Sequence, residues 1–257
     1  FVSSLVIVSC PASSRMSESS SSSSSLAVEQ EEIPDDITEY YDFDPCINTI
    51  NQPHPEGVGV NFDVPTDTQT LNLTNNRLST LSNIQHITCL RKLVLRHNQI
   101  ESLDAEVLKT LSTLVTLDLY ENKLTNVVVL NNQFPILRFL DLSFNPIRKL
   151  TTTFEGFPEL KRLYFVDCKL SLVQGLQNLP KLTMLELGSN RLRTISGIES
   201  LTNLTELWIG RNKISTIENL DTLVNLQRLS LQRNRIVDIQ GLDHLVNLQE
   251  LYLSENG

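Results

Sequence analysis

Seven acidic and aromatic residues recur along this chain at nearly constant spacing, and carboxylates and rings placed in this way could form a binding surface. Six of them follow one another at intervals of 23, 23, 22, 22 and 44 residues, and Tyr120 lies two residues after the first of the six. Carboxylates beside aromatic rings are typical of surfaces that bind another protein. The seven candidate site residues are Asp118, Tyr120, Asp141, Tyr164, Glu186, Trp208 and Tyr252.

Catalytic motifs are missing from the sequence. It contains no phosphate-binding loop, no H-E-x-x-H, no G-x-S-x-G and no C-x-x-C. The four histidines, at positions 54, 86, 97 and 244, are too widely spaced to suggest a metal site. We therefore expect no enzyme activity, no cofactor and no metal, and we interpret the seven residues as partner-binding rather than catalytic.

A repeated pattern must position these residues. The stretch Leu185-Glu-Leu-Gly-Ser-Asn-Arg-Leu192 has the form L-x-L-x-x-N-x-L, and the same form returns along the array. Nine copies at a period of 22 to 24 residues identify a repeat architecture. The asparagine of the pattern falls at positions 76, 98, 122, 145, 190, 212, 234 and 256, with Cys168 in the same place in one copy.

Each copy predicts a short strand followed by a turn. In Leu-x-Leu the two leucines share one face of a strand, because strand side chains alternate. One unit cannot bury that face alone, but stacked units share a continuous core. The asparagine amide can both donate to and accept from backbone groups that the turn leaves unpaired. We interpret Cys168 in the same way, as a structural residue rather than a reactive thiol.

The segment between strands predicts the return path of each coil. In Ile195–Leu204 the apolar residues recur every third position, which suits a 3₁₀ or helical turn. The predicted fold is an α/β leucine-rich-repeat solenoid: a curved horseshoe with a parallel sheet on its concave side and short helical or 3₁₀ segments on its convex side. About nine repeats fill residues 71–257.

The side chains between and beside the strand leucines should then point outward from the concave sheet. The middle position of the strands holds Asp118, Asp141, Tyr164, Glu186, Trp208 and Tyr252, and Tyr120 lies one outward position further on. The leucines already supply the core, so rings are not needed here for packing. Gly188 and Gly210 should leave room for a partner. The alternative is that aromatic residues simply favour strands.

The rest of the chain divides into a leader and a lead-in. Residues 1–56 are Ser-rich and acidic, a composition that predicts disorder. Within them, residues 1–15 are interpreted as upstream sequence, with a signal peptide as the alternative. Residues 57–70 should lead into the array or cap it. The array breaks off within a repeat, so we expect a truncated C-terminus with Leu251 and Leu253 exposed to water.

Charge and hydropathy exclude several kinds of partner. The net charge is −9, and residues 16–76 contain twelve Asp and Glu but no Lys or Arg. Such an acidic segment repels nucleic acid. No stretch is long and apolar enough to cross a bilayer. The four cysteines are not placed to seal the ends of the array with disulfides, which favours a reducing compartment.

Several repeats resemble one family in particular. The 22-residue type and four of its stretches are similar to the leucine-rich-repeat regulatory subunits of type-1 protein serine/threonine phosphatase (the regulatory subunit 7 family). The stretches are Leu117-Asp-Leu-Tyr-Glu-Asn122, Leu140-Asp-Leu-Ser-Phe-Asn145, Leu185-Glu-Leu-Gly-Ser-Asn190 and Leu251-Tyr-Leu-Ser-Glu-Asn-Gly257.

The resemblance implies a non-catalytic scaffold subunit, monomeric within a hetero-complex, that grips the phosphatase catalytic subunit with its concave face. The family's contacts would fall on Asp141, Tyr164, Glu186 and Trp208. It also implies a location in nucleus and cytoplasm. The resemblance leaves open whether binding activates, inhibits or escorts the phosphatase.

Two other functions fit the repeats. One is an adaptor of cilia or the cytoskeleton, and the other is a secreted recognition protein. The sequons at Asn72 and Asn203 matter only for the secreted alternative.

Overall fold

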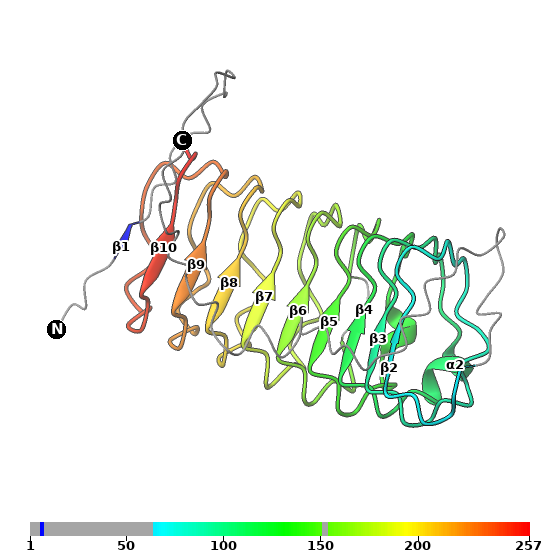
Figure 1. The fold of residues 1–257 in the computed structure, drawn as a ribbon. Helices are drawn as coiled ribbons and strands as arrows, with labels where there is room; N and C mark the ends of the chain where they lie inside the picture. The colour runs from blue at the N-terminus through cyan, green and yellow to red at the C-terminus, as the bar shows by residue number, and fades with distance from the viewer. Residues whose placement is uncertain (1–5, 8–63, 151–153) are drawn as a thin grey trace, which may run out of the picture.

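The repeats form a stack of coils with one parallel sheet along one side (Figure 1). This computed structural model describes residues 6–7, 64–150 and 154–257. The predicted solenoid is confirmed. Its elements are β1 (Val6–Ile7), β2 (Thr70–Asn72), β3 (Lys92–Val94), α2 (Ala105–Lys109), β4 (Thr116–Asp118), η1 (Val128–Leu130), β5 (Phe139–Asp141), β6 (Arg162–Tyr164), β7 (Met184–Glu186), β8 (Glu206–Trp208), β9 (Arg228–Ser230) and β10 (Glu250–Tyr252).

Strands β2 to β10 lie in the sheet in the order of the sequence, and β1 pairs with β10 at the far edge. Each strand pairs in parallel with the equivalent residues of the next repeat, as Leu71 does with Leu93 and Leu93 with Leu117. The strands are parallel because every coil returns to its start before the next strand begins. Apart from β1, the predicted leader of residues 1–56 lies outside the described residues, as do residues 57–63.

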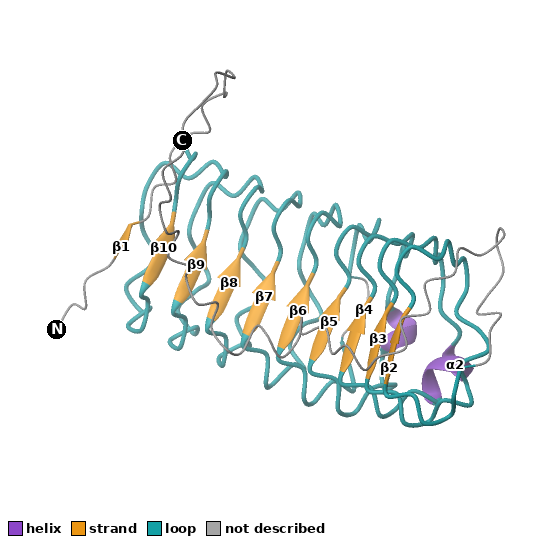
Figure 2. Ribbon diagram, in the orientation of Figure 1, coloured by secondary structure: helices purple, strands orange, loops and turns teal. Residues whose placement is uncertain are grey.

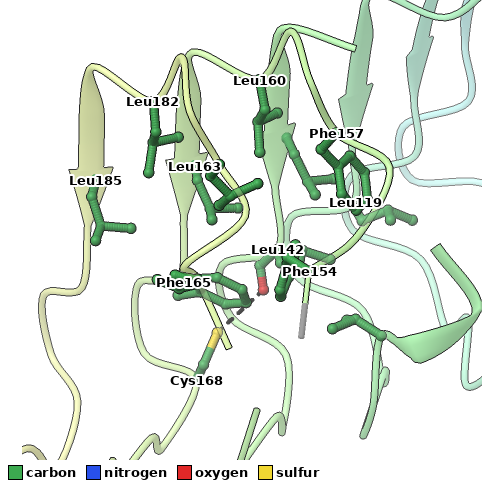
Figure 3. Packing of buried hydrophobic residues seen from close by; sticks show 14 of the residues in the cluster. Leu119, Leu142, Phe154, Phe157, Leu160, Leu163, Phe165, Cys168, Leu182 and Leu185 are labelled. Carbon is green, nitrogen blue, oxygen red and sulfur yellow. Dashed lines mark hydrogen bonds between the residues drawn. The ribbon is translucent and has the colours of Figure 1, made fainter. Parts of the chain in front are cut away.

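The core is a set of stacked apolar columns inside the coils. Leu163 of β6 pairs with Leu185 of β7, and both are fully buried. Phe154 packs edge-on against Phe165, with ring centroids 5.9 Å apart, and against Phe157 at 5.6 Å (Figure 3). Neighbouring repeats therefore bury each other's apolar side chains, as the repeat pattern predicts.

Buried asparagines connect one turn to the next. The Nδ2 of Asn190 donates to the carbonyl of Phe165 in the preceding repeat at 2.7 Å and to that of Leu187 at 2.9 Å. Its Oδ1 accepts from the backbone N–H groups of Cys168 and Leu170. The expected double role of the asparagine is confirmed, and it satisfies backbone groups that the strands leave unpaired.

Cys168 reproduces only half of that role. Its Sγ lies 3.2 Å from the carbonyl of Leu142 in the preceding repeat, in place of an asparagine Nδ2 (Figure 3). A thiol offers no amide oxygen, and the N–H of Ile147 bonds instead to the carbonyl of Asn145 at 2.8 Å. Burial raises the pKa of the Cys168 thiol to about 12, so the group stays protonated. This agrees with a structural role.

The return segments consist mostly of short turns, with little continuous helix (Figure 2). Within the described residues, α2 lies in the one 24-residue repeat and η1 in a 23-residue repeat. The 22-residue repeats make isolated turns instead. The N–H of Leu201 bonds to the carbonyl of Ile198, and that of Leu204 to Leu201. The three-residue period is thus present as single 3₁₀-type bonds, because the shorter segment has no spare residues for a helix.

The last strand differs from expectation at Leu251. This side chain is only 2% exposed, because it points into the stack from β10 in register with Leu229. Leu253 is half-buried. The prediction that Leu251 would face water is therefore wrong.

Candidate protein-binding surface

The candidate residues lie together on the outward side of the sheet. We call this side the strand face. It consists of the outward side chains of β2–β10 and of the residue two positions after each strand. Asp141 pairs in register with Asp118 on one side and with Tyr164 on the other. Glu186 lies between Tyr164 and Trp208. One column of adjacent strands, spaced about 4.8 Å apart, thus carries them in the predicted order.

Ser230 separates Trp208 from Tyr252 in this column. Tyr120 lies outside the column, two residues after Asp118. All four rings of the set are half-buried, so each keeps part of its surface open to a partner. The structure therefore brings the seven residues onto one side of the molecule.

At the β3–β5 end, two carboxylates and one guanidinium form an acidic cluster, which we define as Arg96, Asp118 and Asp141. The Nε of Arg96 contacts Oδ2 of Asp118 at 2.5 Å, and its Nη2 lies 3.9 Å from Oδ2 of Asp141. Both aspartates are buried, whereas the Arg96 side chain is 30% exposed. The two acids therefore face a partner mainly through Arg96.

The column's carboxylates also bind their own backbone. Each accepts a hydrogen bond from the N–H two residues further on, where no strand neighbour provides an acceptor. These acids hence stabilise the turn as well as contributing charge. The pairs are Asp118 with Tyr120 (3.1 Å), Asp141 with Ser143 (2.9 Å) and Glu186 with Gly188 (2.8 Å).

Of the two glycines, Gly188 has a different purpose from the one expected. A Cβ at Gly188 would lie 2.6 Å from Oε1 of Glu186, so this glycine makes room for the Glu186 carboxylate. A Cβ at Gly210 would lie 3.3 Å from the carbonyl oxygen of Gln232, a tight contact. The Glu186 carboxylate takes the space beside Gly188, so the interpretation that this space is reserved for a partner is wrong, whereas Gly210 keeps part of its surface exposed.

Burial raises the pKa of each of the three column acids. The pKa of Asp141 rises to about 6, first through burial and then through the nearby Asp118 carboxylate. Burial raises the pKa of Asp118 too, although Arg96 opposes the change. The pKa of Glu186 rises to about 7, again mainly through burial. The column therefore carries less negative charge near neutral pH than its three acids suggest.

At the β8–β10 end, two rings stack across one small residue. The Trp208 and Tyr252 rings are 5.7 Å apart at their centroids and inclined by 29°. Ser230, on the strand between them, is buried. A small side chain there allows rings from two non-adjacent strands to meet and form one flat apolar surface.

Charged residues frame this stack. Nε1 of Trp208 donates to Glu206 at 3.2 Å, and the hydroxyl of Tyr252 donates to Glu250 at 2.5 Å. Arg228 bonds to both acids, at 2.9 Å to Glu206 and 3.4 Å to Glu250. These five residues, which we call the aromatic platform, hold the two rings in fixed orientations.

Two kinds of structural feature are absent from the described part of the chain. Among residues 64–150 and 154–257, no group of His, Cys, Asp and Glu is arranged to hold a metal ion. In the same part of the chain, no helix is long and apolar enough to span a membrane.

Comparison with known proteins decides the repeat class. The model for two copies of leucine-rich repeats matches residues 180–222 and 224–257, and the model for a leucine-rich repeat matches residues 88–147. This is a leucine-rich-repeat protein. Its strand face is therefore the surface formed by the outward residues of successive repeats.

Two curated proteins are similar to part of this leucine-rich-repeat chain. Chaoptin of Drosophila melanogaster is 40% identical over 90 residues, which are 35% of this chain and 7% of that protein. Protein phosphatase 1 regulatory subunit SDS22 of Saccharomyces cerevisiae is 37% identical over 90 residues, or 34% of this chain and 27% of its own length. The matches thus span only a small part of either relative.

Solved structures share the solenoid. A structure of the TLR13–ssRNA13 complex superposes with a TM-score of 0.69 at 27% identity, covering 74% of this chain and 28% of that one. The leucine-rich-repeat protein LIC12759 of Leptospira interrogans gives a TM-score of 0.59 at 28% identity, covering 75% and 58%. These likenesses support the fold.

Sequence reasoning missed two residues of the strand face and its edge. Arg228 links the two glutamates of the aromatic platform, and Phe144 packs its ring against Tyr120 at 4.8 Å. The register of the repeats could have revealed Arg228, because Glu206 and Glu250 lie 22 residues before and after it. The sequence also held a signal for Phe144, because the equivalent position of the other repeats has a polar residue.

Proposed function

We propose that this chain is a non-catalytic regulatory or scaffold subunit that binds the catalytic subunit of type-1 protein serine/threonine phosphatase through its strand face. The observation that carries the proposal is the single column containing Asp141, Tyr164, Glu186 and Trp208. The similarity to yeast SDS22, named as a protein phosphatase 1 regulatory subunit, supports the choice of partner.

The proposed complex contains one copy of each chain and forms in nucleus and cytoplasm. The aromatic platform and Tyr164 supply apolar contact area, since stacked and half-buried rings lose little conformational freedom on binding. Glu186 supplies an acceptor beside them. The acidic cluster contributes more to the stability of the face than to contact, because Asp118 and Asp141 are buried.

A pull-down with purified phosphatase catalytic subunit tests the proposal. The full chain should retain the enzyme, and a variant with Tyr164, Glu186, Trp208 and Tyr252 all changed to alanine should not. A matched variant with Val224 and Val246 changed to alanine alters exposed residues of the return segments and should bind normally. Equal retention by the strand-face variant would reject the proposed surface, and no retention by the unchanged chain would reject the partner.

A second function, recognition outside the cell, is kept because Asn203 begins an Asn-Leu-Thr glycosylation sequon in the array. The side chain of Asn203 is exposed on a return segment, where Nδ2 donates to the carbonyl of Pro180. Mass spectrometry of protein from its native source distinguishes the two functions. A glycan on Asn203 would favour the extracellular function over the phosphatase.

A further inference from the structure

One backbone position in every described repeat has a left-handed conformation. It lies three residues after the strand, and its φ is between 47° and 61°. We call these residues the turn column. L-amino acids with bulky side chains rarely adopt this conformation, and asparagine and other polar residues adopt it most easily. The column consists of Asn75, His97, Glu121, Phe144, Asp167, Ser189, Arg211, Arg233 and Glu255.

Phe144 is the one apolar member of the turn column. Its φ is 56°, an unfavourable backbone angle for a bulky side chain, and the residue remains 39% exposed although its ring packs against Tyr120. A polar residue would suit this position better in the free protein. The choice of phenylalanine is therefore better explained by a contact that the ring makes with something else.

Other rings and charges support one side of Phe144. Its centroid lies 4.8 Å from that of Tyr120, which in turn contacts the His97 ring at 5.4 Å. The guanidinium of Arg96 lies 5.3 Å from the centre of the Tyr120 ring. The Phe144 ring is thus held in place against Tyr120 at the edge of the strand face.

Carboxylates lie on both sides of Phe144 along the turn column. The N–H of Glu121 bonds to the carbonyl of Ser143, and the N–H of Phe144 bonds to Val166, next to Asp167. Glu121 and Asp167 therefore occupy the rungs immediately before and after the ring. Glu121 is exposed and contacts His97 at 2.8 Å, and Asp167 is half-exposed.

We propose that Phe144, Glu121 and Asp167 form a subsite for an arginine or lysine side chain of a protein bound on the strand face. An aromatic face is electrically negative and attracts a cation, and two carboxylates beside it strengthen that attraction. An apolar side chain would have to remove water from both acids without compensation. A nucleic acid backbone would be repelled. The subsite assumes a protein partner but not the phosphatase in particular.

The test uses a fluorescent peptide of five Gly-Arg repeats at low salt, followed by fluorescence anisotropy. A matched Gly-citrulline peptide has the same shape without the charge. We expect the full chain to bind the arginine peptide at least about five-fold more tightly than the citrulline peptide. This experiment contains no phosphatase, so its outcome is separate from that of the pull-down.

Three variants assign the binding to the subsite. Phe144→Asn removes the ring without changing the charge, and Asn75 already occupies the same position with a φ of 61°. We expect it to weaken peptide binding about five-fold, and the combined Glu121→Gln and Asp167→Asn variant to weaken it at least as much. Glu255→Gln, a distant carboxylate of the same column, should change it less than two-fold.

The thermal midpoint of Phe144→Asn should change little, because loss of the ring contact with Tyr120 is offset by a residue that suits the left-handed backbone better. A loss of peptide binding in this variant is then separate from a loss of folding. Three results would each overturn the subsite: no binding of the arginine peptide, equal binding of the citrulline peptide, or Phe144→Asn binding as tightly as the unchanged chain. The last result would place any peptide binding elsewhere on this acidic chain.

Discussion

The acidic cluster and the aromatic platform occupy the two ends of the same strand face, yet the chain uses them differently. In the cluster, Asp118 and Asp141 are buried and bonded to Arg96 and to their own backbone. In the platform, Trp208 and Tyr252 stack on each other and keep part of their surface exposed. Equivalent repeat positions therefore stabilise the solenoid at one end and present contact area at the other.

The difference teaches that an outward position in a repeat does not by itself make a binding residue. The side chains of Asp118 and Asp141 bend back to their own turns and are buried, whereas the rings of Trp208 and Tyr252 stay half-buried. We thus expect changes in the platform to affect binding and changes in the cluster to affect folding.

The largest effect expected is on binding, at Trp208. Trp208→Ala removes one ring of the stack and should weaken binding of the phosphatase catalytic subunit by about 2 kcal/mol, or about 30-fold in Kd. Titration calorimetry measures this, and Trp208→Phe, which keeps a ring, should lose much less. If both variants bound like the unchanged chain, the platform would have no role in contact.

The next effect is on stability, at Asp118. Asp118→Ala leaves the N–H of Tyr120 without its acceptor and Arg96 without its nearest partner. The free energy of unfolding should fall by about 1–2 kcal/mol, with some compensation because Arg96 is partly exposed to water. Urea denaturation checks this. Asp118→Asn keeps an oxygen for Tyr120 and should lose less. If the alanine variant were as stable as the unchanged chain, the acidic cluster would not stabilise the fold, and it would no longer differ from the aromatic platform in this way.

The free energy of unfolding should depend on pH through Glu186, which lies between the acidic cluster and the aromatic platform. Its pKa rises from the ordinary value of 4.5 to about 7 on folding. The folded chain then binds more protons than the unfolded chain in this window, so the Glu186 contribution to stability falls as pH rises from 4.5 to 7. Glu186→Gln stays neutral and should be more stable than the unchanged chain by about 1 kcal/mol at pH 8.

The same pair should be equally stable near pH 4.5, where the glutamate is protonated in the folded chain. Urea denaturation at both pH values is the measurement. A glutamine variant that gained nothing at pH 8 would show that the Glu186 carboxylate is better solvated than its burial implies.

The smallest effect expected is at the Tyr252 hydroxyl. Tyr252→Phe removes the hydrogen bond to Glu250 and keeps the stack with Trp208. Because the group is partly exposed, unfolding and binding free energies should each change by about 0.5 kcal/mol. Thermal denaturation and titration calorimetry check this, and a change as large as that of Trp208→Ala would mean that the hydroxyl, rather than the ring, makes the contact.

Much of the fold could be predicted because the repeat pattern specifies it directly. Leucine positions fixed the strand register, and the asparagine period predicted bonds such as that from Asn190 to Phe165. The position of the candidate column on one face followed from the same register. Burial of Asp118 and Asp141 could not be read in this way, because it depends on how Arg96 folds over them from the neighbouring repeat.

The return segments and the glycines were also beyond the sequence pattern. A period of three residues is shared by a 3₁₀ helix and by separate turns, so the bonds of Leu201 and Leu204 could not be distinguished from a helix in advance. The sequence suggested open space beside Gly188. The Glu186 carboxylate fills that space, and its rotamer cannot be read from the sequence.

Hydroxyl-radical footprinting of the complex with the phosphatase catalytic subunit tests the central claim most directly. The side chains of Tyr164, Trp208 and Tyr252 should be oxidised several-fold more slowly in the complex than in the free chain. His244, exposed on a return segment, should be oxidised at an unchanged rate. Slower oxidation of His244 with unchanged oxidation of Trp208 would contradict the claim that the strand face binds the partner.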